Sequence, residues 1–563
     1  MSGGDVDAVG QGVGRREWWF PVALAVLIFV VGSAPYVYGY LTAPEGQVFM
    51  GFVGRGTPGA NGYFAFAKQV QEGFHLIENK MTPEPTRRDY FNLEWWVFGQ
   101  MARQFGLSLE AVFHITRAMI VLFYVCAVYW LISLCLGSLF SRRLALLIIC
   151  FGSGLGWLIW LGNHYAHLDL LPSRDIRGVS IFGYLVNKPH FILGAALATM
   201  TQAYHLLAYR RGKTRYFVYS GVAAALHSLV RPYGIPETHA LWLAYPALLC
   251  IRDGQFSFAR FKGAAIAIAV HGPVFAYFIY YAITGSLGNP DWSRLPGHVV
   301  ENFLWMGIPM VAFFLGLPWH LRMRGNSDAS LLLTAWFVLA WLHCGCYPYI
   351  RGGQEAAYYS FSIVPTILTL GVTLPMFWGY LQRVWPWVVA RLPDFSLRDV
   401  RVAGSAVLLA ACLPSSAIVY GEYFTTLRQG TADWTFCISR DLYDALVWLD
   451  GASGEQDVAI ASLPASQFVS RLGRSKTVTG HDFLTAKYLE KNDLVQRFYS
   501  RPEDAVFKTD LLCKYRVQWV VYSEFEQRMG KVDFDAFPWL SAVYRKGNVA
   551  IYKVDLEAAS QVR

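Results

Sequence analysis

Charged side chains are scarce in this sequence: Asp, Glu, Lys and Arg make up 15% of its 563 residues, whereas hydrophobic residues make up 55%. An ordinary soluble domain carries about 25% charged residues. The chain is also too long to form one compact domain. This composition excludes an ordinary soluble protein and predicts a polytopic membrane protein.

Acidic residues are fewer than basic ones, and the formal net charge is +9. In a soluble chain this excess would suggest binding to nucleic acid, but here Lys and Arg gather at the ends of apolar runs. Basic residues in that position set the orientation of membrane spans. We therefore expect no nucleic-acid partner.

Motifs for metal binding or for independent catalysis by the polar tail are lacking. Cys344 and Cys346 form a CxC pair without His or Cys partners at the spacing of zinc sites. The tail contains neither a glycine-rich phosphate loop nor a nucleophile elbow. Cys437 and Cys513 in the tail could form a disulfide outside the cytoplasm or remain free thiols.

What the sequence does contain is a series of apolar runs of about span length. A helix needs about 20 such residues to cross the hydrocarbon core of a bilayer. The first run follows Arg15 and Arg16 and lacks a small-residue cleavage pattern, so we predict an uncleaved span. About eleven spans are predicted in all: 17–40, 117–139, 142–162, 186–208, 216–232, 236–251, 264–283, 299–320, 329–348, 358–381 and 402–421.

The basic residues between these spans fall on alternate sides of the membrane. Because short cytoplasmic loops carry an excess of Lys and Arg, the N-terminal tail, residues 1–16, is predicted inside and the C-terminus outside. The predicted membrane domain covers residues 17–421 and has a large first outer loop at 42–116. The remainder, 422–563, is predicted to lie outside as a separate domain.

The first outer loop has its own helical pattern. Its apolar residues Tyr63, Ala67, Val70 and Phe74 recur at helical spacing with polar residues opposite, which predicts a helix lying in the membrane interface. A second such helix is predicted over Leu93–Phe105, with Trp95 and Trp96 at the level of the lipid headgroups.

The tail alternates helical and strand-like patterns. Arg440–Asp450 is amphipathic, and it is followed by the short apolar runs VAIAS, VQWVVYS and NVAIYKV. This alternation predicts a small α/β domain.

Ionisable residues at the predicted outer ends of spans are the candidates for chemistry, because charge is costly there. The basic candidates are Lys188, His190, Arg231 and Arg351, with His227, Glu237, His239 and His343 close to them in the sequence. Arg can hold phosphate oxygens through two parallel hydrogen bonds, so outward-facing cations ringed by aromatic residues suit an anionic lipid headgroup. The alternative is that they are snorkelling anchors and helix ends.

A carboxylate is also needed if a hydroxyl group is to be activated as a nucleophile at neutral pH. The predicted outer loops supply Glu72, Glu78, Glu84, Glu94, Asp89, Asp169, Asp175 and Asp291.

Several short motifs resemble those of a known family. They are Tyr63-Phe64-Ala65, Gln71-Glu72-Gly73, NKMTPEP at 79–85, Pro189-His190-Phe191, Arg231-Pro232-Tyr233 and, in the tail, Thr479-Gly480-His481. Together with the long first outer loop and the α/β tail, they resemble the GT-C superfamily of integral membrane glycosyltransferases. The resemblance is to members of the protein mannosyltransferase and aminoarabinose transferase kind, and closer still to bacterial multispan members.

This resemblance implies transfer of a sugar from a polyprenyl-phosphate donor to a glycan, lipid or protein acceptor, on the outer face of the bacterial inner membrane. It implies that an acid near the start of the first outer loop acts as a base or as the partner of a divalent cation, Mg²⁺ or Mn²⁺. It also implies that basic residues at later span ends hold the donor phosphate. In this sequence those residues are Arg231, Arg351, Lys188 and His190.

The chain lacks the acid at the place where the family has it. Ahead of Tyr63 the residues Thr57 to Gly62 include no carboxylate, and the amide of Asn61 cannot act as a base at neutral pH. Gly234 likewise stands where relatives often have an acid. Tyr63 and Glu72 match other positions of the first-loop motif.

Two readings of this departure remain open. In the first reading another carboxylate acts as the base, and the candidates in order of preference are Asp89, Glu84 and Asp175. In the second reading the chain keeps the scaffold but does not catalyse the reaction. In the second case it would bind lipid or glycan, or act as a subunit of an envelope assembly. A transporter would predict internal repeats, and none is evident between the two halves of the sequence.

Overall fold

The computed structural model describes residues 14–54, 57–167, 181–284, 299–320, 327–345, 353–389, 397–428, 436–501 and 504–562, without the side chains of 57–58, 299–306, 345, 353–359, 388–389 and 397–401. The chain divides into two compact units. Unit 1 comprises Met1–Ser33, Thr116–Phe278 and Leu295–Glu422, and unit 2 comprises Ala34–Ile115, Ile279–Arg294 and Tyr423–Arg563.

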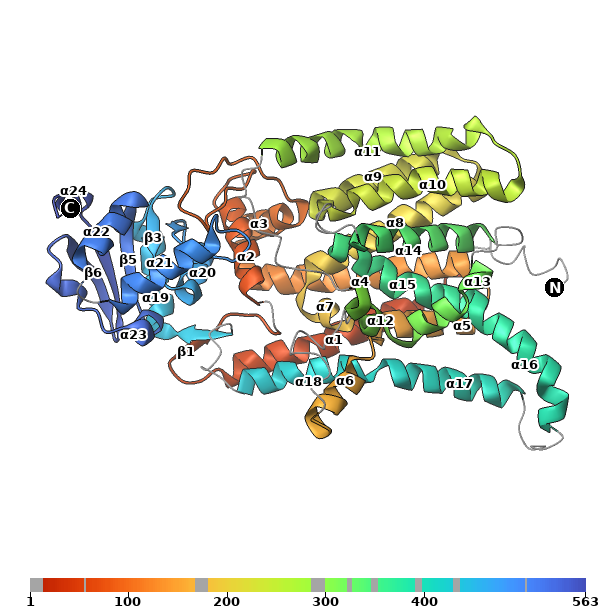
Figure 1. Cartoon of the computed structure of the whole chain (residues 1–563). Coiled ribbons are helices and arrows are strands. Elements are labelled where there is room, and N and C mark those ends of the chain that lie inside the picture. The colour runs from red at the N-terminus through yellow and green to blue at the C-terminus, as the bar shows by residue number, and fades with distance from the viewer. Residues whose placement is uncertain are drawn as a thin grey trace. The chain divides into compact units, whose positions relative to one another are not determined.

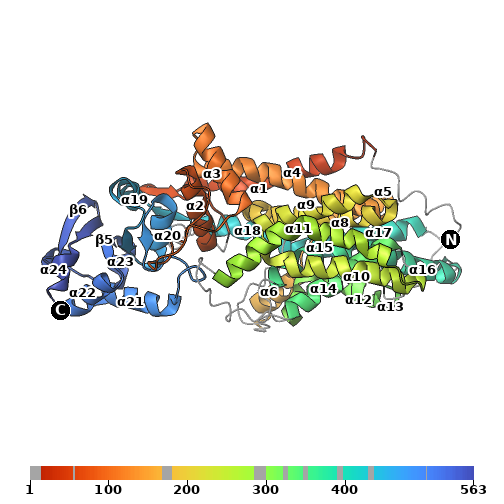
Figure 2. The same cartoon turned by 90° about the horizontal axis from the view of Figure 1, so that it is seen from above.

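Unit 1 consists of helices, most of which run roughly parallel or antiparallel to one another (Figures 1 and 2). They are α1 (Trp19–Thr42), α4 (Leu109–Cys135), α5 (Leu139–Phe151), α6 (Gly156–Tyr165), α7 (Ile181–Asn187), α8 (Pro189–Arg211), α9 (Thr214–Val230), α10 (Ile235–Asp253), α11 (Phe258–Thr284), α12 (Val299–Leu315), α13 (Leu317–His320), α14 (Asp328–Gly345), α15 (Gly353–Leu368), α16 (Leu374–Val389), α17 (Leu397–Cys412) and α18 (Pro414–Arg428). Four of these, α1, α4, α11 and α18, contribute to both units.

Six helical segments in the described part of the chain are long and apolar enough to cross a membrane. They are Trp19–Thr42, Leu109–Cys135, Pro189–Arg211, Phe258–Thr284, Ser360–Trp387 and Val402–Arg428, and the pair α5 and α6, bent by 45°, would add a seventh. Each predicted span falls on one of the helices or on consecutive helices. The polytopic helical class is therefore confirmed, while the number of spans stays a prediction.

Small residues allow close packing of the helices in unit 1. A Cβ on Gly221 of α9 would lie 2.7 Å from the carbonyl oxygen of Ala267 in α11, and one on Gly263 of α11 would lie 2.1 Å from the ring of Phe217. Where lipid replaces water, helices associate through such close contacts rather than through the hydrophobic effect.

A chain of polar side chains also joins α9, α10 and α11. The hydroxyl of Ser228 and the ring of His239 both hydrogen-bond to His271, at 2.9 Å and 2.8 Å. His271 is fully buried, so its two partners satisfy both ring nitrogens in the interior. These hydrogen bonds link three helices that follow one another in the sequence.

The helices α10 and α14 are antiparallel and are joined at both ends. Arg252 at the end of α10 binds Asp328 at the start of α14, with a nitrogen to oxygen distance of 2.5 Å. The opposite ends bring Glu237 of α10 next to Trp336 and His343 of α14. The Arg252 end carries the basic loops, and the Glu237 end is the one predicted to lie outside.

Unit 2 contains a five-stranded sheet in the order β4-β3-β5-β7-β6. Strands β3 (Val458–Ile460), β4 (Lys476–Thr477) and β5 (Val517–Tyr522) are parallel, and β6 (Leu540–Lys546) and β7 (Val549–Val554) are antiparallel to their neighbours. The predicted runs VAIAS, VQWVVYS and NVAIYKV supply β3, β5 and β7. The predicted sheet-containing tail is confirmed.

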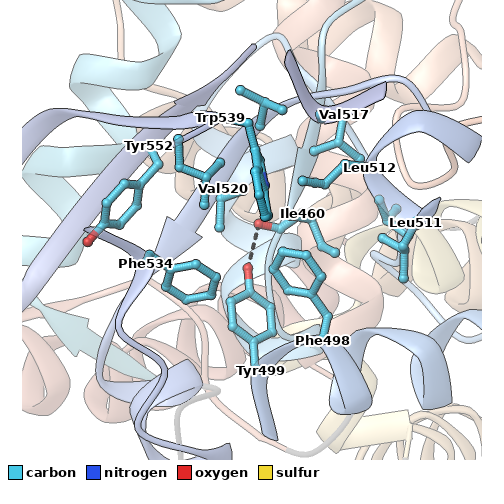
Figure 3. Packing of buried hydrophobic residues seen from close by; sticks show 14 of the residues in the cluster. Ile460, Phe498, Tyr499, Leu511, Leu512, Val517, Val520, Phe534, Trp539 and Tyr552 are labelled. Atoms are coloured by element: carbon cyan, nitrogen blue, oxygen red, sulfur yellow. Dashed lines mark hydrogen bonds between the residues drawn. The ribbon is translucent and has the colours of Figure 1, made fainter. Parts of the chain in front are cut away.

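Helices cover both faces of this sheet. On one face α19 (Arg440–Ala452) and α20 (Leu463–Leu472) pack, and on the other face α21 (Tyr488–Ser500) and α22 (Ala505–Lys514) pack. Successive strand residues alternate between the two faces, as the pleat requires. On the second face the hydroxyl of Tyr499 donates to the backbone oxygen of Ile460 at 2.8 Å, within the cluster of buried hydrophobic residues (Figure 3).

The loop at 42–116, predicted from the sequence to be the first outer loop, belongs to the same unit as the tail. Its strand β1 (Gln47–Phe49) pairs antiparallel with β2 (Cys437–Ser439), and the carbonyl of Lys80 accepts the amide hydrogen of Thr477 at the sheet edge. The predicted boundary at 421/422 instead assigned this loop to the membrane domain. Pairing across hundreds of residues is the physical reason for the difference. Cys437 and Cys513 are free thiols in this unit.

The loop helices are α2 (Thr57–Gln71) and α3 (Leu93–Phe105). The prediction that the apolar face of the first lies in the membrane interface is wrong, because Ala67 and Val70 are buried against α3. Trp95 is also buried, and its ring stacks on Tyr63 with centroids 4.9 Å apart. Protein, not lipid, covers this face.

Candidate functional site

Three of the predicted phosphate ligands meet at one end of unit 1. The guanidinium carbon of Arg231 lies 3.7 Å from the centre of the Phe191 ring, and the amine of Lys188 lies 5.1 Å from the same centre. The ring of His190 lies 4.7 Å from it, centroid to centroid. We call Lys188, His190, Arg231 and Phe191 the Phe191 cluster.

Local backbone structure explains why these residues meet. Pro189 occupies the first turn of α8, where its fixed φ favours a helix start, and this places Lys188 just before the helix. Arg231 ends α9 in an extended conformation with φ −148°, and its amide donates to the carbonyl of His227 at 2.7 Å. The short helix Pro232–Gly234 then turns the chain into α10.

Gly234 has a packing reason to lack a side chain. A Cβ at this position would lie 2.7 Å from Cε1 of His227. The space that a side chain at position 234 would need is therefore filled by the imidazole ring of His227. This turn supplies no carboxylate.

The Phe191 cluster gathers positive charge in an aromatic surrounding. Arg231 is 4% exposed and its guanidinium also faces Tyr233, while the amine of Lys188 faces Tyr184. Cations over aromatic faces are stabilised by the ring quadrupole, which helps to keep them charged out of water. Such an arrangement can bind a phosphate group and stabilise the negative charge that develops on its oxygens.

One carboxylate lies buried at the same end of α10. Glu237 is 6% exposed, accepts the indole hydrogen of Trp336 at 2.5 Å, and lies 3.9 Å from Nδ1 of His343. Glu237 could be noticed in the sequence, since it is an ionisable residue next to a predicted span end. Its partners on α14 could not be read from the sequence.

In unit 2, Asn61, which stands where the sequence resemblance predicts an acid, is fully buried. Its amide nitrogen donates to Oε1 of Gln467 at 3.1 Å, and its oxygen accepts from Arg471 at 3.1 Å. Arg471 also donates to Glu110 at 2.8 Å and to the carbonyl of Met50 at 2.6 Å. Asn61 therefore joins the loop to the tail.

Glu84, the second candidate base, forms an ion pair with the tail. Its carboxylate lies 2.5 Å from the amine of Lys491 and also accepts from the hydroxyl of Thr82. Partial burial raises the pKa of Glu84, but the hydrogen bonds from Lys491 and Thr82 outweigh it and hold the pKa below its ordinary value. A carboxylate stabilised as an anion is a weak base.

The other candidates differ in their surroundings. Asp89 is half-buried and precedes Tyr90, whose backbone pairs with Ile77 and whose ring lies 5.3 Å from that of Tyr281. Burial raises the pKa of Glu72, which lies 3.6 Å from Lys68. Asp175 and Arg351 lie outside the described residues.

Glu78 was not singled out as a base, yet it is the most enclosed carboxylate of the loop–tail contact. Lys476, Arg88 and Lys80 lie 2.6, 3.4 and 3.6 Å from its oxygens. Burial opposes its ionisation, but the hydrogen bond from Lys476 and the nearby Lys80 charge hold the pKa of Glu78 below its ordinary value. The ion pairs with distant partners give no signal in the sequence.

The described residues do not fit a divalent cation. Among them no group of three or more His, Cys, Asp or Glu side chains could hold a metal ion. Of the carboxylates in the first outer loop, Glu78 and Glu84 are instead paired with Lys476 and Lys491. No step is therefore assigned to a cation.

Comparison with known proteins supports the fold through structure alone. No family model matches the sequence, and no curated protein matches it. The structure is similar to the oligosaccharyltransferase AglB from Archaeoglobus fulgidus in complex with an inhibitory peptide and a dolichol-phosphate. The TM-score is 0.54 and the identity 12%, over 90% of this chain and 69% of that chain.

The apo form of the Archaeoglobus fulgidus enzyme gives a TM-score of 0.55 at 12% identity, over 90% of this chain and 70% of that chain. The chain has the GT-C fold. ArnT from Cupriavidus metallidurans in the apo state matches with a TM-score of 0.47 and 14% identity, over 96% of this chain and 98% of that chain. The two oligosaccharyltransferase structures, with TM-scores of 0.54 and 0.55, confirm the fold expected from the sequence motifs.

Within this fold the predicted site residues form two sets. Lys188, His190 and Arg231 come together around Phe191 in unit 1. Asn61, Tyr63, Glu72 and Glu84 lie in unit 2, where Tyr63 packs on Trp95 and the other three engage or approach the tail.

Proposed function

We propose that this GT-C protein is a membrane glycosyltransferase that takes a sugar from a polyprenyl-phosphate-linked donor. The acceptor is a glycan, lipid or protein on the outer face of the bacterial inner membrane. The observation that carries the proposal is the Phe191 cluster, in which Arg231, Lys188 and His190 share one aromatic ring at the start of α8. AglB, which shares the fold, has been seen with dolichol-phosphate.

The proposed role of the Phe191 cluster is to bind the donor phosphate and to stabilise it as it leaves. When the bond from the sugar to the phosphate breaks, negative charge grows on the phosphate oxygens, and donors already in place stabilise that charge without reorganising. Arg231 would hold two oxygens in its fork and Lys188 would add a point charge. Arg351 is proposed as a further phosphate ligand.

The acceptor hydroxyl needs a base for inverting transfer by direct displacement. Asp89 is the first choice among the proposed bases, because Glu84 is held as an anion by Lys491 and Thr82. Asp175 follows as the second choice.

The test is sugar transfer by the purified protein from a panel of polyprenyl-phosphate-linked sugars, repeated with Asp89→Asn. We expect transfer from at least one donor, and a fall in kcat of about 10²-fold or more when the base is removed. Repeating the assay with a chelator and then with Mg²⁺ or Mn²⁺ tests the cation. Full activity of Asp89→Asn would reject Asp89 as the base.

A second function is favoured by the position of Asn61. This residue, which stands where the resemblance predicts an acid, is fully buried and hydrogen-bonded to Gln467 and Arg471. On this reading the protein binds lipid or glycan as a non-catalytic scaffold or as a subunit of an envelope assembly. It predicts saturable binding of polyprenyl phosphate without transfer from any donor.

A further inference from the structure

Two arginines at the turn between α8 and α9 are held by one tyrosine. Arg211 ends α8, and Arg215 lies in the first turn of α9. They donate to the hydroxyl of Tyr216 at 3.1 Å and 3.3 Å, respectively. Their guanidinium carbons lie 5.8 Å and 5.0 Å from the centre of the same ring. The tyrosine therefore keeps two positive charges close together.

No acidic side chain neutralises this pair. Arg252, at the end of α10, lies 2.5 Å from Asp328, so another basic loop of unit 1 carries its own counter-charge. In the part of the chain that the structure describes, neither Arg211 nor Arg215 forms an ion pair with Asp or Glu, and both are exposed. Because like charges repel, an anion that contacts both guanidinium groups would stabilise the pair.

An exposed apolar stripe on α9 begins next to Arg215. It consists of Tyr219, Val222 and Leu226, which lie on the same face of the helix as Arg215 because they follow it at helical spacing. They are 46%, 44% and 37% exposed, whereas the residues between them are buried or partly buried. In a membrane protein, acyl chains of the lipid cover such a face.

A row of aromatic rings marks the level at which the stripe meets the charged pair. The ring of Tyr216 lies 6.1 Å from that of Tyr219, centroid to centroid. The ring of Tyr219 lies 5.4 Å from that of Tyr204 on α8, which in turn lies 4.8 Å from that of Trp130 on α4. Tyr and Trp gather where acyl chains give way to headgroups. The row therefore indicates that the arginines lie at headgroup level and the rest of the stripe among the acyl chains.

The geometry points to a binding site for an anionic phospholipid at the turn between α8 and α9. Arg211 and Arg215 hold the phosphate group of the lipid through paired hydrogen bonds, and an acyl chain lies along the stripe on α9. A zwitterionic lipid fits less well, because its ammonium group brings a third positive charge to the pair. The site lies at the opposite end of α8 from Phe191, about 30 Å away at 1.5 Å per residue. It is therefore separate from the proposed donor site, and the inference holds whether or not sugar transfer occurs.

The experiment is native mass spectrometry of the full-length protein in detergent, titrated with phosphatidylglycerol or with phosphatidylcholine of the same acyl chains. We expect the unchanged protein to bind phosphatidylglycerol more tightly. The double variant Arg211→Gln with Arg215→Gln should bind it about 30-fold more weakly, the combined effect of two basic residues at an anionic lipid surface. Arg528→Gln in the tail is the matched control, since Arg528 is exposed and lies 5.8 Å from the ring centre of Phe525. It should leave the affinity for both lipids unchanged.

Tyr216→Phe gives a second test that leaves both charges in place. It removes the hydroxyl that accepts from the two arginines, so we expect phosphatidylglycerol to bind about two- to fivefold more weakly, because the side chains must then be ordered on binding. Unchanged affinity would reject the held pair.

An excess of glycerol 3-phosphate, which has a phosphate group but no acyl chains, should not displace the lipid; displacement would indicate a site for a free anion and overturn the inference. The inference is also overturned if the unchanged protein binds phosphatidylglycerol no better than phosphatidylcholine, or if the double variant keeps the preference.

Discussion

Asn61 shows at the scale of one residue how a buried amide joins two distant parts of the chain. Its nitrogen and its oxygen are both used, one by Gln467 and one by Arg471. A carboxylate has no hydrogen to donate to Gln467, so the amide suits this position better than an acid. The residue therefore ties the loop to the tail.

Asn61→Leu should lower the free energy of unfolding by about 1–3 kcal/mol, because it leaves buried groups of Gln467 and Arg471 without partners. Asn61→Asp should cost less, since its oxygen still accepts from Arg471. Thermal unfolding of the purified protein, followed by tryptophan fluorescence, measures both. Gln104→Leu on the exposed side of α3 is the control, and equal stability of Asn61→Leu and this control would refute the assignment.

Glu78 predicts a pH dependence of stability. Its pKa in the folded protein is lowered. The ionised Glu78 therefore contributes its full stabilisation of the fold above the ordinary carboxyl pKa of about 4.3, and this stabilisation is lost as pH falls through the lower pKa of the folded protein. Glu78→Gln should therefore flatten the acid limb of a plot of unfolding midpoint against pH. Glu72 is the matched control: its raised pKa gives the opposite sign, so Glu72→Gln should not destabilise the protein at neutral pH. A Glu78→Gln profile that matches the unchanged protein would contradict this account.

Single residues could be picked from the sequence where a rule of membrane chemistry singles them out, and their role as phosphate ligands stays a prediction. Lys188, His190 and Arg231 stand out because ionisable residues are rare at span ends, and the structure places them around one ring. The ion pair of Glu78 with Lys476 could not be predicted, since neither residue breaks a local rule. Long-range pairing is decided by the fold.

At the scale of elements, the crossing of α2 and α3 depends on Gly99. A Cβ there would lie 2.4 Å from Cβ of Val70 and 2.5 Å from the backbone oxygen of Ala67, so the helices meet backbone to backbone. Gly99→Leu should destabilise the protein by about 1–3 kcal/mol or more, the usual cost of overpacking. The unfolding midpoint measures it, with Gln104→Leu again as the control. A stable Gly99→Leu protein would show that the two helices do not cross here.

The elements themselves were predictable because apolar runs of span length have few other uses, and every predicted span falls on helical structure. The face of α2 was misassigned for a physical reason. An apolar stripe at helical spacing fits a lipid surface and a protein surface equally well, and only the packing of Gly99 against Val70 distinguishes them.

At the scale of the whole molecule, the first outer loop and the tail form one compact unit although hundreds of residues separate them in sequence. The pairing of β1 with β2, in which Gln47 lies opposite Ser439, gives a direct test. Residues directly opposite each other on paired antiparallel strands have side chains close enough to form a disulfide when both are cysteine. Gln47→Cys with Ser439→Cys should therefore crosslink on mild oxidation and migrate faster on a non-reducing gel. Gln47→Cys alone is the control, and no crosslink in the double variant would contradict the pairing.

The central claim is that the Phe191 cluster holds the phosphate of a polyprenyl-phosphate donor. The most direct measurement is the rate of sugar transfer by the protein in lipid nanodiscs, compared with Arg231→Ala and with Lys213→Ala, an exposed cation at the far end of α8. The account predicts transfer by the unchanged protein and by Lys213→Ala. For Arg231→Ala it predicts a rate at least about 10²-fold lower, as for loss of a preorganised donor. Transfer that Arg231→Ala leaves unchanged would contradict it.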